Sequence, residues 1–89
     1  MIQSFRNKAL AAYVETGKPK GVPANLAKRA MIRLDALDNA ASLDELKYWR
    51  CHPLNTDPIR YALDVNGPWR ITFEWRSGDA YLVDLEQYH

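Results

Sequence analysis

Apolar and polar side chains alternate with a period of two near the C-terminal end of this chain. The alternation is clearest over eight consecutive residues: Trp69, Arg70, Ile71, Thr72, Phe73, Glu74, Trp75 and Arg76. A strand that buries one face and exposes the other has this period. The stretch therefore predicts the central strand of a sheet with one packed face and one free face.

Turn chemistry flanks this strand at residues 66–68 (Asn-Gly-Pro) and 77–79 (Ser-Gly-Asp). Both segments offer a glycine for positive φ, so they predict an antiparallel meander with neighbouring strands at 61–65 and 80–85. We favour a three-residue first loop, because it pairs apolar residues with apolar residues on one face. The expected pairs are Val65 with Trp69, Leu63 with Ile71, Tyr61 with Phe73, and Asp64 with Arg70. In the last strand, the core positions are expected to be Tyr81, Val83 and Leu85.

Two helices are predicted before the sheet. The first begins at Ser4 as N-cap and ends near Gly17. The second has Pro23 in its first turn and continues to Asn39. Their apolar stripes are Phe5, Ala9, Ala12 and Tyr13 in the first, and Leu26, Ala30, Met31, Leu34 and Leu37 in the second. Two amphipathic helices can cover the packed face of the sheet.

A capping-box pattern at Ser42–Glu45 predicts a short third turn, and residues 48–59 predict an irregular or edge strand followed by a loop. Helices followed by strands indicate an α+β fold, with two N-terminal helices on one face of a small antiparallel β-sheet. At 89 residues, we expect a single domain spanning residues 1–89.

Composition narrows the classes of function. The chain has a net charge of +1, one cysteine, no signal sequence and no apolar run that could span a bilayer. We therefore expect a cytoplasmic protein without a membrane partner, in which Cys51 is a small buried residue rather than a nucleophile. Any basic surface must be local, because the net charge is small.

The residues suited to chemistry form a small set. One cysteine and two histidines 37 positions apart give no zinc spacing, and there is no phosphate-binding glycine loop. The candidates are His52, Arg70, Tyr88 and His89. Metal-free RNA cleavage through the 2′-hydroxyl needs a base, an acid and a cation at the phosphate, and these side chains suit those roles. Each also has a simpler interpretation, such as a solvated Arg70 paired with Asp64.

Further aromatic and basic residues also allow two interpretations. Tyr48 and Trp49 lie outside the alternation and are candidates for stacking on a base, although most aromatic residues here belong to the core. Lys28, Arg29 and Arg33 are expected on the solvent face of the second helix, with contact to RNA or a protein partner as the alternative.

Six segments together resemble a known family. They are Met1-Ile-Gln-Ser-Phe-Arg-Asn-Lys, Gly21-Val-Pro-Ala, His52-Pro-Leu, Trp69-Arg-Ile-Thr-Phe, Gly78-Asp-Ala-Tyr and Tyr88-His89. In this order they resemble the HigB-type plasmid-maintenance killer toxins of the RelE/ParE superfamily, nearly end to end. The resemblance implies a RelE/ParE-like fold and a toxin that cuts mRNA in the ribosomal A site, without a metal or another cofactor.

The resemblance also implies partners and site residues. A cognate helix-turn-helix antitoxin is expected to neutralise the toxin, and operator DNA is expected to be bound only through their complex. Arg70 matches the arginine that holds the scissile phosphate, Tyr88 and His89 match the terminal pair that orients RNA and transfers protons, and His52 matches the family histidine. The expected RNA contacts are Arg70, Arg60, Lys28 and Arg29.

Three residues depart from the family pattern. Asn55 stands where a lysine is expected, Gln87 replaces an acidic residue, and Asp64 adds a carboxylate opposite Arg70. These changes keep open an alternative: a catalytically degenerate toxin-fold protein that binds the antitoxin or the ribosome without cutting RNA. A gyrase-poisoning toxin is a third possibility, against which the terminal Tyr-His pair speaks.

Overall fold

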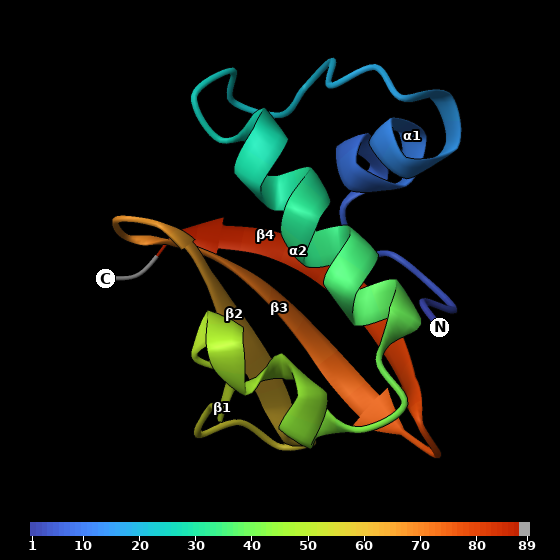
Figure 1. The fold of residues 1–89 in the computed structure, drawn as a ribbon, viewed down its shortest axis with the longest axis vertical. Helices are drawn as coiled ribbons and strands as arrows, with labels where there is room; N and C mark the ends of the chain where they lie inside the picture. Colours follow the sequence, from blue (N-terminus) through green and yellow to red (C-terminus); the bar gives the residue numbers. More distant parts are fainter. Residues whose placement is uncertain (88–89) are drawn as a thin grey trace.

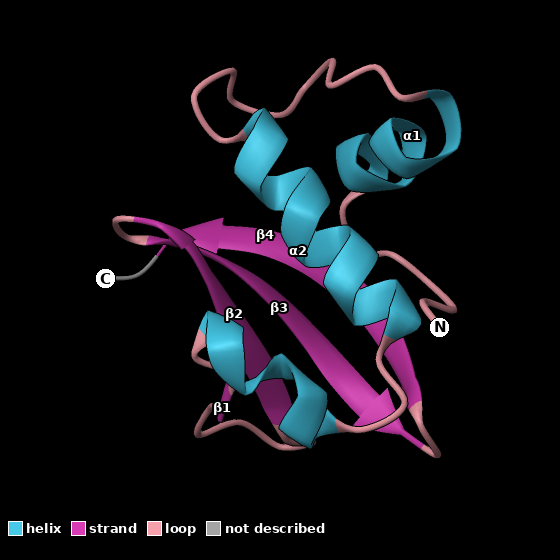
Figure 2. Cartoon of the chain, in the orientation of Figure 1, coloured by secondary structure: helices cyan, strands magenta, loops and turns pink. Residues whose placement is uncertain are grey.

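The computed structural model describes residues 1–87 and has an α+β fold. Its elements are α1 (Lys8–Thr16), α2 (Ala27–Asn39), the 3-10 helix η1 (Leu43–Trp49), β1 (His52–Pro53), β2 (Arg60–Asn66), β3 (Trp69–Arg76) and β4 (Asp79–Gln87). The strands form one antiparallel sheet in the order β1-β2-β3-β4. Figure 1 shows α2 and η1 in front of this sheet, with α1 beside α2, and Figure 2 separates helices from strands by colour. The predicted fold class is confirmed.

The predicted register between β2 and β3 is largely confirmed. Three of the expected pairs are present: Leu63 with Ile71, Tyr61 with Phe73, and Asp64 with Arg70. The fourth pair is wrong, because Asn66 rather than Val65 lies opposite Trp69 and the register shifts between Asp64 and Asn66. The turn therefore contains only Gly67 and Pro68, and the extra residue is accommodated by a bulge at Val65.

A second irregularity changes the side of the sheet to which β4 directs one aromatic residue. Thr72 lies opposite Asp84 but Glu74 lies opposite Tyr81, and Leu82 in the shifted segment has φ of 51°. Directly opposed residues share a face, so Tyr81 lies on the polar face with Glu74. There its ring is covered by the guanidinium of Arg76, 4.0 Å from the ring centroid. The expectation that Tyr81 belongs to the core is wrong, because alternation cannot reveal a bulge.

The first helix begins later than predicted. Asn7, not Ser4, is the N-cap, and its side chain accepts hydrogen bonds from the backbone of Ala9 and Leu10 at 2.9 and 3.1 Å. Ser4 instead accepts a hydrogen bond from the Leu82 backbone, as residues 2–5 run alongside β4. The predicted end is confirmed at the C-cap residue Gly17, with φ of 76°.

The second helix ends at Asn39 as predicted but begins at Ala27, because Pro23 lies in a preceding turn. The capping box is also confirmed: the Glu45 carboxylate accepts a hydrogen bond from the Ser42 backbone at 2.9 Å. This box starts η1, the element that leads directly into β1. The described helices include none that is both long and apolar enough to cross a membrane.

The core lies between the helices and the sheet. Its fully buried large side chains include Leu10, Leu26, Leu34, Leu37, Leu46, Leu63, Ile71, Phe73 and Val83. Trp69 and Trp75 are half-buried against it, as the alternation predicted. The opposite face is less open than expected, since Ala62 and Thr72 are fully buried there.

Candidate functional site

A row of charged residues crosses the polar face at one end of the sheet. Arg70 on β3 lies opposite Asp64 on β2 and Glu86 on β4. Directly opposed residues on one face of an antiparallel sheet are neighbours, so acidic residues flank Arg70 on both adjacent strands. Gln87, the last described residue, pairs with Trp69 and so ends β4 at this same end of the sheet. The predicted Tyr88 and His89 lie outside the described residues.

Arg50 belongs to this row, although it was not predicted as a site residue. It caps the C-terminal end of η1 with φ of 59° and ψ of 42°. Its Nε forms an ion pair with Asp64 Oδ2 at 3.2 Å. Asp64 thus lies opposite one arginine in the sheet and forms an ion pair with another. The only sequence signal for Arg50 is a basic residue two positions before His52, since the turn that directs it to Asp64 is not evident in the sequence.

His52 lies on the edge strand β1, opposite Ala62. Asp64 is two residues further along β2 and therefore on the same face as Ala62. His52 Nδ1 is 2.7 Å from the backbone oxygen of Arg50. A carbonyl oxygen only accepts, so Nδ1 carries the proton and donates. In the neutral imidazole, Nε2 is then the basic nitrogen.

A pocket of about 220 Å³ lies beside His52. Its lining residues are Leu43, Asp44, Lys47, Cys51, His52, Pro53 and Tyr61. Lys47 forms an ion pair with Asp44 at 2.7 Å. Cys51 is half-buried, and burial raises the pKa of its thiol, which favours the unreactive protonated form, as expected from the sequence.

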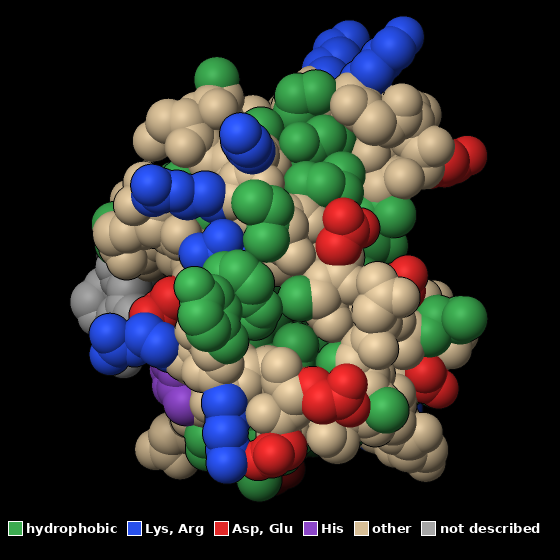
Figure 3. Space-filling model, viewed as in Figure 1, with side chains coloured by type: hydrophobic (Ala, Val, Ile, Leu, Met, Phe, Trp, Pro, Cys, Tyr) green, Lys and Arg blue, Asp and Glu red, His purple; other side chains and the backbone are tan. Residues whose placement is uncertain are grey.

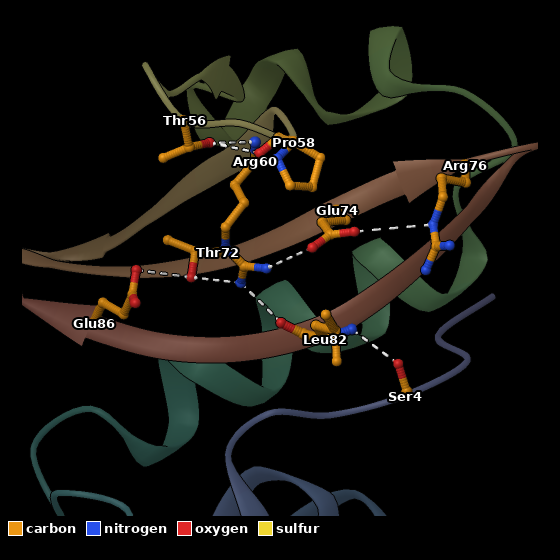
Figure 4. A network of polar contacts seen from close by, with 9 residues as sticks. All are labelled: Ser4, Thr56, Pro58, Arg60, Thr72, Glu74, Arg76, Leu82 and Glu86. Atoms are coloured by element: carbon orange, nitrogen blue, oxygen red, sulfur yellow. Dashed lines mark hydrogen bonds and ion pairs between the residues drawn. The ribbon is translucent and has the colours of Figure 1, made fainter.

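Arg60, expected to contact RNA, lies within the protein. Its side chain is 8% exposed, and its Nη2 donates to Thr72 Oγ1 at 3.1 Å and to the Leu82 carbonyl at 2.8 Å. Its Nη1 is 3.7 Å from Glu74 Oε2 (Figure 4). Burial, followed by the charge of Arg6, lowers the pKa of Arg60. A guanidinium with these partners has little surface for a phosphate, so the geometry favours a structural role.

Two further predicted contacts, Lys28 and Arg29, are exposed on α2. Figure 3 shows most lysine and arginine side chains along one side of the face formed by α2 and η1, a further basic group at the top, and most acidic side chains on the other side. Arg33, expected on the solvent face, instead packs over the Trp49 ring at 4.2 Å and donates to the Asp64 carbonyl at 2.9 Å. The predicted contacts on α2 thus remain available to a partner, whereas Arg33 holds α2 to η1 and β2.

The aromatic pair on η1 differs in exposure. Tyr48 is 82% exposed and meets Trp49 edge to face, with ring centroids 4.5 Å apart. Trp49 is half-buried against the core and covered by Arg33. Only Tyr48 therefore keeps a ring face for stacking with a base.

The positions that depart from the resemblance also differ in location. Asn55 is exposed in the loop after β1, and Gln87 ends β4. Across residues 1–87, no three histidine, cysteine, aspartate or glutamate side chains are grouped in a way that could hold a metal ion. The described part of the site therefore offers arginines and an imidazole.

Comparison with known proteins identifies the family. Residues 3–89 match the model of the HigB-like toxin family, described as the RelE-like toxin of the type II toxin-antitoxin system HigB. The chain is also 41% identical over 92 residues to the protein named "Endoribonuclease HigB" from Proteus vulgaris, with all of both chains covered. The chain therefore belongs to the HigB-like family of RelE-like toxins, whose members pair with an antitoxin in type II systems.

Proposed function

We propose that this toxin is a ribosome-dependent endoribonuclease that cuts mRNA and so inhibits translation. The observation that carries the proposal is the end of the sheet where Arg70, Arg50 and His52 share one face and from which the chain continues to Tyr88 and His89. The name of the Proteus vulgaris relative supports RNA cleavage as the reaction.

The cleavage requires three actions at one phosphate. A base removes the proton of the 2′-hydroxyl, whose oxygen attacks phosphorus, and an acid protonates the departing 5′-oxygen. We assign proton transfer and RNA positioning to His89 and Tyr88, and binding of the scissile phosphate to Arg70. A guanidinium suits this role because it presents paired donors to phosphate oxygens and stays charged. His52 supports the reaction through Nε2, while its Nδ1 is held by the Arg50 carbonyl.

The partners follow from this function. We propose that the antitoxin is of the helix-turn-helix type, that operator DNA is bound only through the toxin-antitoxin complex, and that the toxin acts in the cytoplasm. Lys28 and Arg29 would contact ribosomal or messenger RNA, because both are exposed cations on α2.

A second candidate function is binding without cleavage. Gln87 is a neutral amide at the end of β4, and Asn55 is neutral in the exposed loop after His52. Each removes a charge that the resemblance places near the reacting groups. A toxin fold with these changes would bind its antitoxin or the ribosome and leave RNA intact.

Mapping of mRNA cuts by primer extension distinguishes these functions. The assay uses a reconstituted translation reaction with untagged protein, His89→Ala, Arg70→Ala and a reaction without ribosomes. We expect cuts within A-site codons that need ribosomes and fall roughly 100-fold or more in His89→Ala, the scale of a lost proton-transfer group. Uncut message with blocked translation would instead establish the binding function.

A further inference from the structure

The geometry points to Arg50 as a second phosphate-binding residue of the RNA site, held beside Arg70 by Asp64. This inference rests on the proposed function, because it assigns a new contact to the same RNA. It also identifies a cation near His52, close to the loop in which Asn55 replaces the expected lysine.

The side chain of Arg50 is anchored but accessible. Its Nε forms an ion pair with Asp64 Oδ2 at 3.2 Å, while the side chain as a whole is 82% exposed. Because so much of the side chain is exposed, the guanidinium can reach a ligand without leaving Asp64. An arginine tethered through Nε presents its terminal nitrogens to a phosphate with less loss of conformational freedom than an untethered one.

The same ion pair changes the field around Arg70. Asp64 lies directly opposite Arg70, where an uncompensated carboxylate would offset part of the attraction to a phosphate. Arg50 supplies Asp64 with its own cation. On the other side, Glu86 accepts a hydrogen bond from Thr72 at 3.0 Å. Asp64 therefore lies opposite Arg70 but forms its ion pair with Arg50, which compensates the carboxylate charge.

The backbone of Arg50 also accepts a hydrogen bond from the imidazole of His52. Its carbonyl oxygen lies 2.7 Å from His52 Nδ1 and fixes Nε2 as the basic nitrogen. Arg50 therefore supplies a cation through its side chain and selects the tautomer of His52 through its backbone carbonyl. This coupling places the proposed phosphate contact within the site rather than at a remote surface.

The backbone conformation argues against a purely structural choice of residue. Arg50 has φ of 59°, in the left-handed region that glycine adopts without the steric cost of a Cβ. A helix C-cap in this region is most often glycine. A functional role of the side chain would explain why an arginine, and not a glycine, occupies this position. The substitution Arg50→Gly therefore removes the side chain while suiting the backbone.

The experiment measures binding of a single-stranded RNA oligonucleotide with 2′-O-methyl sugars, which cannot be cleaved, as a function of salt. The proteins are the untagged wild type, Arg50→Gly, Arg50→Lys and Arg76→Ala. Arg76 is the matched control, because it is an exposed arginine on the same face with a carboxylate 3.9 Å away, but at the other end of β3. We expect Arg50→Gly to reduce the slope of log affinity against log salt by about 0.7, the value for one phosphate contact. Arg50→Lys and Arg76→Ala should keep the wild-type slope.

The possible outcomes separate this inference from the proposed function. An unchanged slope in Arg50→Gly, or no binding by the wild type, overturns the role of Arg50. The cleavage reaction is run with the same proteins. If wild type and Arg50→Gly cut mRNA equally and bind RNA with the same slope, the nuclease function stands and the inference about Arg50 fails. In another outcome, the wild type binds RNA without cutting it, while Arg50→Gly alone shows a smaller slope of log affinity against log salt. That result supports the phosphate contact of Arg50 and rejects the nuclease function. A thermal midpoint for Arg50→Gly no lower than that of the wild type excludes unfolding as the cause.

Discussion

At the scale of single residues, the orientation of His52 determines what it can contribute. The hydrogen bond from Nδ1 to the Arg50 carbonyl leaves Nε2 as the functional nitrogen. Asparagine can reproduce the donor at Nδ1, whereas glutamine extends its amide toward the position of Nε2. The two substitutions therefore distinguish the structural part of the imidazole from the part that faces RNA.

We predict that His52→Asn lowers ribosome-dependent cleavage by roughly tenfold or more, on the scale of one lost hydrogen bond to a charged group, with little change in unfolding. His52→Gln should retain more activity, because its amide can still reach RNA. Single-turnover cleavage rates and thermal midpoints measure the two effects. Equal activity of both variants with wild type would exclude a contribution from Nε2.

At the scale of elements, Arg60 connects three strands. It projects from β2 and donates to Thr72 on β3 and to the Leu82 carbonyl at the bulge in β4. Its Nη1 also lies near Glu74, which in turn approaches Arg76. The polar face is thus held by a buried arginine instead of an apolar layer (Figure 4).

We predict that Arg60→Ala lowers the free energy of unfolding by about 3 kcal/mol, because it leaves the buried Thr72 hydroxyl and the Leu82 carbonyl without their donor and removes the nearby cation from Glu74. Equilibrium unfolding in urea measures this change. The control Arg76→Ala, at an exposed position, should stay within about 0.5 kcal/mol of wild type. A stable Arg60→Ala that has lost RNA binding would return Arg60 to the RNA-contacting set.

The same scale shows what the sequence could predict. Alternation set the pairing of Leu63 with Ile71, because a register slip would have buried polar residues. It failed at Tyr81 and Val65, since a bulge inserts a residue without changing the composition of either strand. The segment containing Phe5 was assigned to a helix because its apolar spacing also suits one, whereas parallel bridges to β4 are long-range contacts.

The site residues also divide into those that strand register predicts and those that it does not. Asp64 was correctly placed opposite Arg70, because strand register alone determines that pair. Arg60 was expected to contact RNA, but its hydrogen-bond partners come from two other strands and bury it. Arg50 was missed because it reaches Asp64 only through its own left-handed backbone conformation at the end of η1, which the sequence pattern does not indicate. Side chains brought together by turns and bulges were therefore those that the pattern could not reveal.

At the scale of the whole molecule, the distribution of charge matters more than its sum. Twelve basic and eleven acidic residues give a net charge of only +1. On the face formed by α2 and η1, however, most basic side chains lie along one side and most acidic ones along the other, with a further basic group at the top (Figure 3). Such a separation can steer a molecule toward a polyanion even when its net charge is small.

This argument gives a prediction about α2. The double substitution Lys28→Glu with Arg29→Glu should slow association with ribosomes by roughly tenfold at low salt, and the difference should shrink as salt screens the field. The control is Lys8→Glu with Lys18→Glu, exposed positions at α1 and just after it. Each reversal changes the charge by two, so both doubles shift the net charge from +1 to −3. Stopped-flow association rates measure the effect. An equal loss in both doubles would show that net charge, and not the basic side at α2, directs the toxin to the ribosome.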